Sequence, residues 1–347
     1  MALPMIGLGI IDRERPRIER IFRDRTHPLD AYNDDELYRK YRFPRAEILM
    51  LTDLIINHLR QSNKNHSVPP VLQVCTALRF YATGVMHNVS GDIAGIHEST
   101  ACRIIRKVSL AFEAKLRQYV TFHNNNHEIM RAKIGFHEKA GFPNVVGAVD
   151  GTHIRMQAPK DNEFMYVNRK GYHSLNVQVV CNHEMKFTNA VIRWPGATHD
   201  SRIFRNSELC TIFERGEVDG YLIGDKGYPL RPFLLTPYFN PVHPHQQRYN
   251  RIHAVTRSIV ERTIGVWKRR FRSMHEENRM SPQRICAVIA ATMVLHNIAR
   301  DLKLPDIDDE EVDDQQIMVN DEVYNGPVAP NGRIVRDMIA HELQDNA

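Results

Sequence analysis

The 347-residue sequence has no long hydrophobic run. None of its apolar stretches approaches the roughly 20 residues that a membrane-spanning helix needs, so we expect no membrane contact. The first residues lack a basic segment followed by a cleavage site, which predicts no secretory signal. The five cysteines are scattered and form no Cys-x-x-Cys pair. This pattern argues against a zinc ribbon and favours a reducing compartment.

Several catalytic motifs are also missing. There is no G-x-x-x-x-G-K-[ST] loop, which argues against an ATP-driven motor, and no His-Glu-x-x-His helix. His153, His173 and His199 lie near the carboxylates discussed below, but no Cys/His ligand pattern accompanies them. We therefore expect structural or supporting roles for these three histidines rather than zinc binding.

Charge is distributed unevenly along the chain. The whole sequence has 46 Lys/Arg and 41 Asp/Glu residues, a net charge of +5. Residues 301–347 hold 13 of the acidic and 3 of the basic residues, which leaves 43 basic and 28 acidic residues in 1–300, a net charge of +15. A basic body with an acidic tail favours an anionic partner such as DNA. The alternative is a soluble protein that happens to be basic.

Pattern and composition divide the chain into four segments. Residues 1–30 are charged and marked by prolines, which indicates a partly ordered arm. Residues 31–130 show helical spacing of apolar side chains and predict a helical domain. Residues 140–302 alternate apolar runs with helical patterns and predict an α/β domain. Residues 303–347 are predicted to be an acidic tail, with disorder expected over Asp306–Asp314.

The helical segment contains a helix-turn-helix-like layout. A helix over Val71–Ala82, a short one over Ser90–Ala94, a turn at Gly95-Ile96 and a helix over Glu98–Phe112 are predicted in this order. The last helix carries three basic residues suited to phosphate contact, namely Arg103, Arg106 and Lys107. A helical bundle with a solvated basic face is the alternative.

After residue 140 the pattern changes to short strands. Four are predicted at 144–150, 175–182, 187–194 and 220–225, with helical segments over Asp200–Arg205 and 207–216 before the fourth. A proline-rich loop over 228–250 and helices over 256–273 and 282–301 follow. Strands, helix, strand and helix in this order predict a ribonuclease-H-like catalytic core, a mixed sheet with flanking helices.

Four carboxylates stand at informative places in this pattern. Asp150 and Asp225 each end an apolar strand-like run, Asp200 follows the third strand, and Glu261 lies on a basic amphipathic helix. In the predicted core the first and fourth strands are neighbours, so Asp150 and Asp225 would face each other beside Glu261. Carboxylate oxygens suit hard divalent cations, and two such ions can cleave a phosphodiester.

Each of these carboxylates also has an ordinary explanation. Asp150-Gly151 and Asp225-Lys226-Gly227 could be turns. Asp200 could cap the helix that follows it. Glu261 could pair with Arg257 or Arg262 on a solvated helix face.

Six motifs make the chain resemble the PIF/Harbinger-type DDE transposases, especially the animal Harbinger-transposase-derived nucleases. They are Gly147-Ala148-Val149-Asp150-Gly151-Thr152-His153-Ile154, Tyr166-Val167-Asn168-Arg169-Lys170-Gly171, Trp194-Pro195-Gly196 with His199-Asp200-Ser201-Arg202, Gly224-Asp225-Lys226-Gly227-Tyr228, Val260-Glu261-Arg262 and Leu295-His296-Asn297-Ile298. The resemblance implies a catalytic triad of Asp150, Asp225 and Glu261 that holds two Mg²⁺ or Mn²⁺ ions, with Asp200 as a possible fourth ligand. It also implies a Myb-like DNA-binding partner protein.

The sequence thus predicts a metal-dependent DNA endonuclease that is derived from, or still acts as, a transposase. Basic residues near the later motifs, Lys226, Lys268, Arg269 and Arg270, are expected to contact DNA phosphates, with a solvated charge run as the alternative. A catalytically silent DNA-binding or adaptor protein is the competing function. We expect residence in the nucleus and cytoplasm and self-association into an oligomer.

Overall fold

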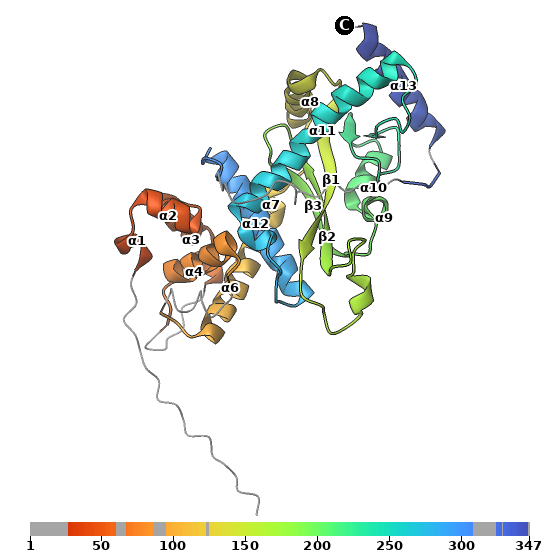
Figure 1. The fold of residues 1–347 in the computed structure, drawn as a ribbon. Helices are drawn as coiled ribbons and strands as arrows, with labels where there is room; N and C mark the ends of the chain where they lie inside the picture. Colours follow the sequence, from red (N-terminus) through yellow and green to blue (C-terminus); the bar gives the residue numbers. More distant parts are fainter. Residues whose placement is uncertain are drawn as a thin grey trace, which may run out of the picture.

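The computed structural model describes residues 27–59, 67–85, 95–122, 125–307, 324–327 and 329–345. In this part of the chain one five-stranded sheet carries helices on both faces, and further helices precede it in the sequence (Figure 1). None of the described helices is both long and apolar enough to cross a membrane.

The sheet has the strand order β3-β2-β1-β4-β5. Its strands are β1 (Val145–Arg155), β2 (Ser174–Cys181), β3 (Phe187–Pro195), β4 (Tyr221–Ile223) and β5 (Leu234–Leu235). β2 runs antiparallel to β1 and β3, whereas β4 runs parallel to β1 and β5. The mixed sheet is consistent with the predicted catalytic core, and the first and fourth strands are neighbours as predicted.

β4 ends at Ile223, so Asp225 follows the strand instead of ending it, and three further elements differ from the sequence prediction. β1 continues past Asp150 to Arg155, because Thr152 and Ile154 keep pairing with β2, so Asp150 lies inside the strand. β5 lies in the predicted loop 228–250 and, with two residues, is too short to leave a pattern. α11 (Pro244–Arg270) begins well before residue 256, because a proline is compatible with the first turn of a helix and Gln246 completes a capping box there.

Two hydrophobic clusters cover the two faces of the sheet. On one face α11 and α12 (Pro282–Asp301) pack against side chains such as Val179, and on the other face α9 (Asp200–Arg205) and α10 (Glu208–Glu214) pack against its neighbour Val180. Successive residues of a strand point to opposite faces, so a strand buried on both sides is apolar throughout.

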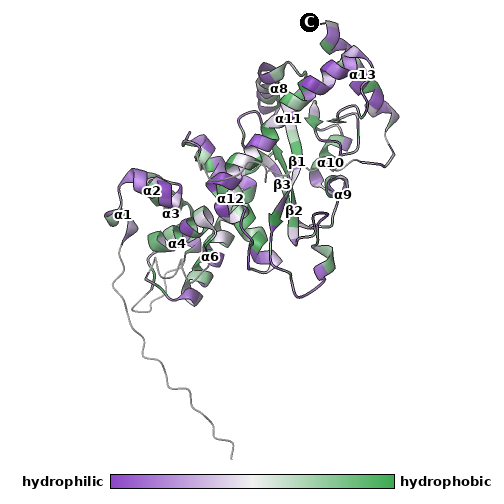
Figure 2. Cartoon of the chain, viewed as in Figure 1, coloured by the Kyte–Doolittle hydropathy of each residue, from purple (hydrophilic) through white to green (hydrophobic). Residues whose placement is uncertain are grey.

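The N-terminal helices lie on the side of α12 that faces away from the sheet (Figure 1). α12 packs against both α6 (Glu98–Glu113) and β3, and most of its residues are buried. In Figure 2 the strands of the sheet are largely hydrophobic, whereas α2 (Asp34–Tyr41) is largely hydrophilic. The remaining elements of the described chain are α1 (Pro28–Ala31), α3 (Arg45–Ile55), η1 (Ile56–His58), α4 (Pro70–Thr83), α7 (Leu116–Tyr119), α8 (Asn126–Ala140), η2 (Glu163–Met165) and η3 (Arg272–Met274).

The structure describes only the two ends of the predicted helix-turn-helix segment. α4 and α6 confirm the two long helices, and Gly95 has a positive φ of 61°, as the predicted turn requires. The short helix predicted at Ser90–Ala94 lies outside the described residues. The same holds for residues 1–26 of the N-terminal arm and for residues 308–323 of the acidic segment.

The predicted acidic tail contains a helix that the sequence pattern was not used to predict. α13 (Pro330–Asp345) buries Ile339, Ala340 and Leu343 and packs against α11 and β5. Just before it, the backbone N–H of Tyr324 donates to the carbonyl of Lys226 at 2.7 Å. The acidic residues of the tail are concentrated in 306–322, whereas residues 330–345 have three acidic and two basic residues and place Val335, Ile339 and Leu343 at helical spacing. Treating 303–347 as one acidic tail therefore obscured a helix that packs on the core.

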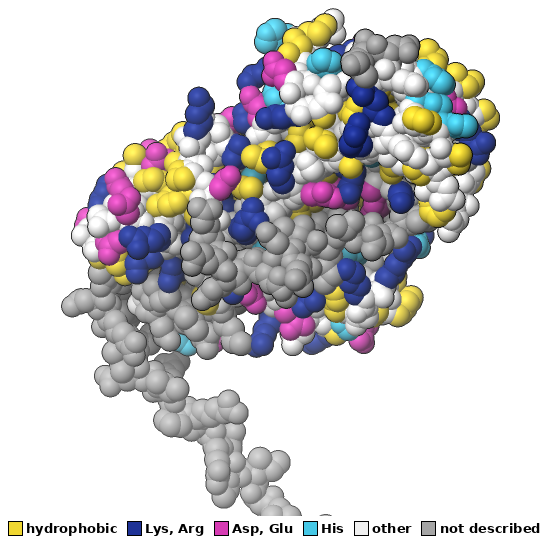
Figure 3. Space-filling view, turned by 45° about the horizontal axis from the view of Figure 1, so that its top comes forward, with side chains coloured by type: hydrophobic (Ala, Val, Ile, Leu, Met, Phe, Trp, Pro, Cys, Tyr) yellow, Lys and Arg dark blue, Asp and Glu magenta, His cyan; other side chains and the backbone are white. Residues whose placement is uncertain are grey.

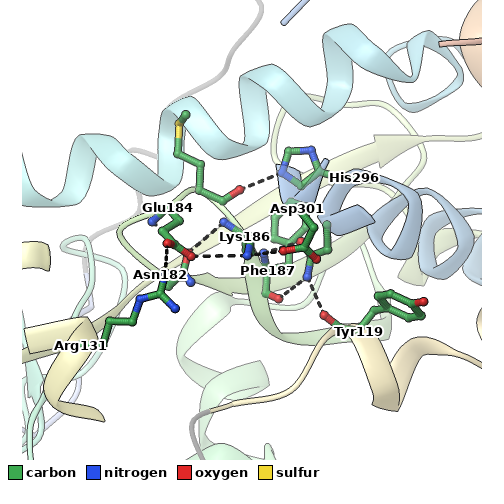
Figure 4. A network of polar contacts seen from close by, with 10 residues as sticks. Tyr119, Arg131, Asn182, Glu184, Lys186, Phe187, His296 and Asp301 are labelled. Atoms are coloured by element: carbon green, nitrogen blue, oxygen red, sulfur yellow. Dashed lines mark hydrogen bonds and ion pairs between the residues drawn. The ribbon is translucent and has the colours of Figure 1, made fainter. Parts of the chain in front are cut away.

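The last of the six sequence motifs has a structural role. Asn297 accepts from the backbone N–H of Phe187 at 2.9 Å and donates to the carbonyls of Phe187 and Tyr119, each at 2.7 Å. His296 bonds the carbonyl of Met185 at 2.9 Å. Figure 4 shows this network, in which Lys186 also pairs with Asp301. The motif therefore fastens α12 to the turn between β2 and β3.

Candidate active site

Asp150 is held inside β1, on the side that faces α11. Its cross-strand neighbour on β2 is Val179, and the side chain is only 8% exposed as a residue. Its Oδ1 accepts a hydrogen bond from the N–H of Gly151 at 2.9 Å. A carboxylate inside a buried strand is costly without a compensating partner, so its position is not that of the surface turn considered as an alternative.

Asp225 comes next to Asp150 through the parallel pairing of β1 with β4. Ala148 is in register with Ile223, and each aspartate lies two residues further along its strand direction. Oδ1 of Asp225 accepts from the N–H of Gly227 at 2.9 Å, so this carboxylate does also shape the turn. Its Oδ2 is buried and has no hydrogen-bond partner among the described residues. An orphaned carboxylate oxygen indicates a place for a cation.

Asp200 approaches from the opposite side of the sheet. It is the first residue of α9, and His199, not Asp200, is the N-cap. The fully buried carboxylate accepts from the amide of Asn176 on β2 at 2.8 Å. A Cβ atom on Gly151 would lie 2.4 Å from Oδ1 of Asp200, so only glycine lets this carboxylate reach β1. Asn176 was not among the predicted site residues, although a polar residue within a predicted strand was a usable signal.

Glu261 reaches the site from α11 and pairs with Arg257, one helical turn before it. The same guanidinium lies 3.4 Å from Oδ2 of Asp150. The pairing with Arg257 was one of the ordinary explanations for Glu261, and the structure confirms the contact. It does not confirm a solvated helix face, because Arg257 is only 17% exposed and links two of the four carboxylates.

Negative charge is crowded around Asp150 and Asp225. Burial, and then the carboxylates of Asp150 and Asp200, raise the pKa of Asp225 to about 8. Burial also raises the pKa of Asp150 to about 7, with Arg257 opposing the shift and Asp200 and Glu261 adding to it. Buried carboxylates that repel one another are stabilised in their ionised forms by a bound cation.

The donor set therefore fits a divalent metal, although the side chains are not arranged around one. Among the described residues, no three His, Cys, Asp or Glu side chains already form a group that could hold a metal ion. The contacts explain why, because Asn176 engages Asp200 and Arg257 engages Asp150 and Glu261. All four carboxylates supply the hard oxygen atoms that Mg²⁺ and Mn²⁺ prefer.

The basic residues predicted to contact DNA lie in different surroundings. Arg103 and Arg106 are exposed on α6, and Lys107 donates to Gln73 at 3.5 Å. Arg270 is fully buried and donates to the hydroxyl of Tyr38 and the carbonyl of Pro305, so its prediction as a DNA contact is corrected.

The remaining basic candidates belong to α11 and to the turn after β4. Lys268 donates to the carbonyl of His153 at 3.1 Å, and burial lowers its pKa to about 8, so it braces β1. Arg269 is half-buried, whereas Lys226, beside Asp225, is exposed.

The three histidines near the motifs bond to other side chains. His153 contacts Ser174 at 3.0 Å, His173 contacts Glu163 at 3.0 Å, and His199 contacts Arg169 at 2.7 Å. These contacts agree with the supporting roles expected for them.

The carboxylates lie on β1 and after the end of β4 of a mixed five-stranded sheet, and on the helices α9 and α11. Comparison with known protein families identifies the class of protein to which a chain with these residues belongs. The sequence profile of the DDE superfamily endonuclease family matches residues 149–297, which include all four carboxylates. DDE superfamily endonucleases generally depend on divalent metal ions.

Comparison with individual known proteins identifies a narrower group within this superfamily. The chain is 35% identical over 276 residues to "Putative nuclease HARBI1" of Rattus norvegicus, covering 78% of this chain and 79% of that protein. It is 34% identical to the Homo sapiens protein of the same name over the same shares of both chains. "Protein ALP1-like" of Arabidopsis thaliana is 27% identical over 71% of this chain and 64% of its own length. No solved structure is significantly similar. The chain belongs to the Harbinger-transposase-derived nucleases of the DDE superfamily.

Substituting Gly151 by alanine tests the placement of Asp200. The new Cβ would meet the carboxylate of Asp200, and overpacking of this kind costs about 1–3 kcal/mol of stability. We expect Gly151→Ala to lower the melting temperature and to weaken Mn²⁺ binding measured by calorimetry. Gly147→Ala is the matched control on the same strand, since its Cβ would lie 2.8 Å from Val180 rather than from a carboxylate. Equal Mn²⁺ affinities in the two variants would contradict a role for Asp200 in the metal site.

Proposed function

We propose that this protein is a DNA endonuclease that cleaves phosphodiester bonds with two divalent metal ions held by Asp150, Asp225 and Glu261, with Asp200 as a further ligand. The observation that carries the proposal is the buried, unpartnered Oδ2 of Asp225 beside Asp150. Mg²⁺ or Mn²⁺ bound there would supply activation of the attacking water or 3′-hydroxyl and stabilisation of the departing oxygen.

In this proposal the protein positions the metal ligands and surrounds them with a buried environment of low dielectric constant. β1 carries Asp150 within the sheet, Asp225 follows the end of β4 by two residues, and the bonds from Gly151 and Gly227 orient one oxygen of each. Asn176 holds Asp200 against β1. A ligand carried by a strand, such as Asp150, and ligands supported by hydrogen bonds are more precisely placed than unsupported ligands on loops.

Exposed basic residues among the described residues support DNA as the substrate. Figure 3 shows acidic side chains flanked by Lys and Arg side chains on one face of the molecule. Lys226 lies in the turn beside Asp225, and the exposed Arg103 and Arg106 provide phosphate contacts on the N-terminal helices. Phosphate contacts of this type contribute most of the non-specific affinity for DNA and are weakened by salt.

Cleavage of supercoiled plasmid tests the proposal. Purified protein should convert supercoiled plasmid to nicked or linear DNA when Mg²⁺ or Mn²⁺ is present and should be inactive in EDTA. The competing function, a catalytically silent DNA-binding or adaptor protein, predicts a mobility shift of the DNA with no cleavage under either condition. If cleavage appears only after a Myb-like protein is added, the enzyme depends on that partner.

On the family resemblance alone, we further propose a Myb-like partner protein, self-association and residence in both nucleus and cytoplasm. Co-purification, light scattering and cell fractionation test these three points separately.

A further inference from the structure

One basic side chain, Arg257, lies among the candidate metal ligands. Its two terminal nitrogens reach different carboxylates, one Oδ2 of Asp150 at 3.4 Å and the other Oε1 of Glu261. It is 17% exposed, against 11% for the side chain of Asp150 and 31% for that of Glu261. The positive charge of Arg257 also lowers the pKa of Asp225, against the effects of burial and of the neighbouring carboxylates.

This geometry occupies carboxylate oxygens that the metal ions would need. A planar guanidinium with a fixed fork of donors can bridge two carboxylates, and its delocalised charge tolerates partial burial. Asp150 comes from β1 and Glu261 from α11, so the bridge ties the central strand to the long helix. Buried carboxylates need an opposite charge to remain ionised, and here that charge is part of the chain.

We propose that Arg257 is an internal counter-cation that takes the place of a metal ion in the metal-free enzyme and must leave Asp150 and Glu261 before metal binds. This inference rests on the function proposed above. Arg257 competes directly for ligand oxygens and repels an incoming cation, so it sets the metal concentration at which the site fills. In return it stabilises the metal-free protein.

Two measurements on Arg257→Gln test the inference. Calorimetric titration with Mn²⁺ at pH 8 should show binding on the order of tenfold tighter than in the wild type, because a competitor and a repelling charge are both removed. Thermal unfolding in EDTA should show a lower melting temperature for the variant, and Mn²⁺ should raise that temperature more than in the wild type. Tighter metal binding is not expected from a residue whose role is only structural.

Matched variants sharpen the test. Arg262→Gln removes the same charge from the exposed residue next to Glu261 and should leave Mn²⁺ affinity within about twofold. Arg257→Lys keeps the charge but not the two-pronged fork, and should give an affinity between those of the wild type and Arg257→Gln. If Arg257→Gln binds Mn²⁺ equally well or more weakly, the counter-cation role is wrong.

Asp225→Asn separates this inference from the proposed function. If Asp225→Asn abolishes Mn²⁺ binding while Arg257→Gln leaves it unchanged, the metal site stands and only the role of Arg257 fails. If neither the wild type nor Arg257→Gln binds Mn²⁺ in a way that depends on Asp225, the metal site and the role of Arg257 fail together.

Discussion

Asparagine in place of Asp150 or Asp225, or glutamine in place of Glu261, will lower the rate of metal-dependent plasmid nicking by at least about 10³-fold. Each substitution keeps the size of the side chain but replaces an anionic ligand oxygen by an amide. The metal ions contribute several kcal/mol of transition-state stabilisation, and each 1.36 kcal/mol corresponds to a factor of ten in rate. Initial rates of nicking in Mg²⁺ and in Mn²⁺ measure the effect.

Two controls make this result specific. Asp161→Asn changes an exposed carboxylate outside the candidate site and should retain wild-type activity. Circular dichroism should show that each inactive variant is folded. Asp200→Asn reports on the fourth carboxylate, with a similar loss if it binds metal and a smaller loss if it only positions β1. Nicking by both Asp150→Asn and Asp225→Asn at wild-type rates would refute the proposed site.

The second large effect is on stability, and here the substitution is expected to be favourable, whereas the substitutions above lower activity. Asp225→Asn should make the metal-free protein more stable than the wild type at pH 8, by an amount on the order of a few kcal/mol. Burial and neighbouring carboxylates raise the pKa of Asp225 from 3.8 to about 8, so its ionised form is disfavoured in the fold. Asparagine keeps an oxygen for the hydrogen bond from Gly227 but carries no charge.

The pH dependence follows from the direction of the shift. Between about pH 4 and pH 8 the unfolded chain ionises Asp225 while the folded chain keeps it protonated, so wild-type stability falls as pH rises. The advantage of Asp225→Asn should therefore be near zero at pH 4 and largest at pH 8 and above. Urea unfolding in EDTA at several pH values measures it, with Asp161→Asn as the reference.

Two further results would complete the interpretation of this stability effect. Saturating Mn²⁺ should reduce or reverse the advantage of Asp225→Asn, because the metal stabilises only the protein that can bind it. An Asp225→Asn protein that is less stable than the wild type at pH 8 without metal would show that Asp225 does not bear the repulsion inferred here. Such a trade of stability for a charged site is common where function requires crowded like charges.

Much of the catalytic core could be predicted from the sequence because its elements carry strong local patterns. The alternating apolar residues of β2 and β3, the start of α9 at Asp200 and the apolar α12 all agree closely with the predicted ranges. Boundaries were wrong where local signals conflict with packing. Prolines before α11 favoured a loop, and the acidic residues that precede α13 led to the whole of 303–347 being predicted as a tail.

The sequence by itself determined which carboxylates are present, near which strands and helices they lie and which family the motifs resemble. Those properties depend on residue types and spacing, which local patterns record. Only the tertiary structure decided that Asp200 reaches β1 through the space left by Gly151, that Asn176 holds it, and that Arg257 bridges Asp150 and Glu261. These contacts join residues of separate elements, whose distances depend on how sheet and helices pack rather than on their order in the chain.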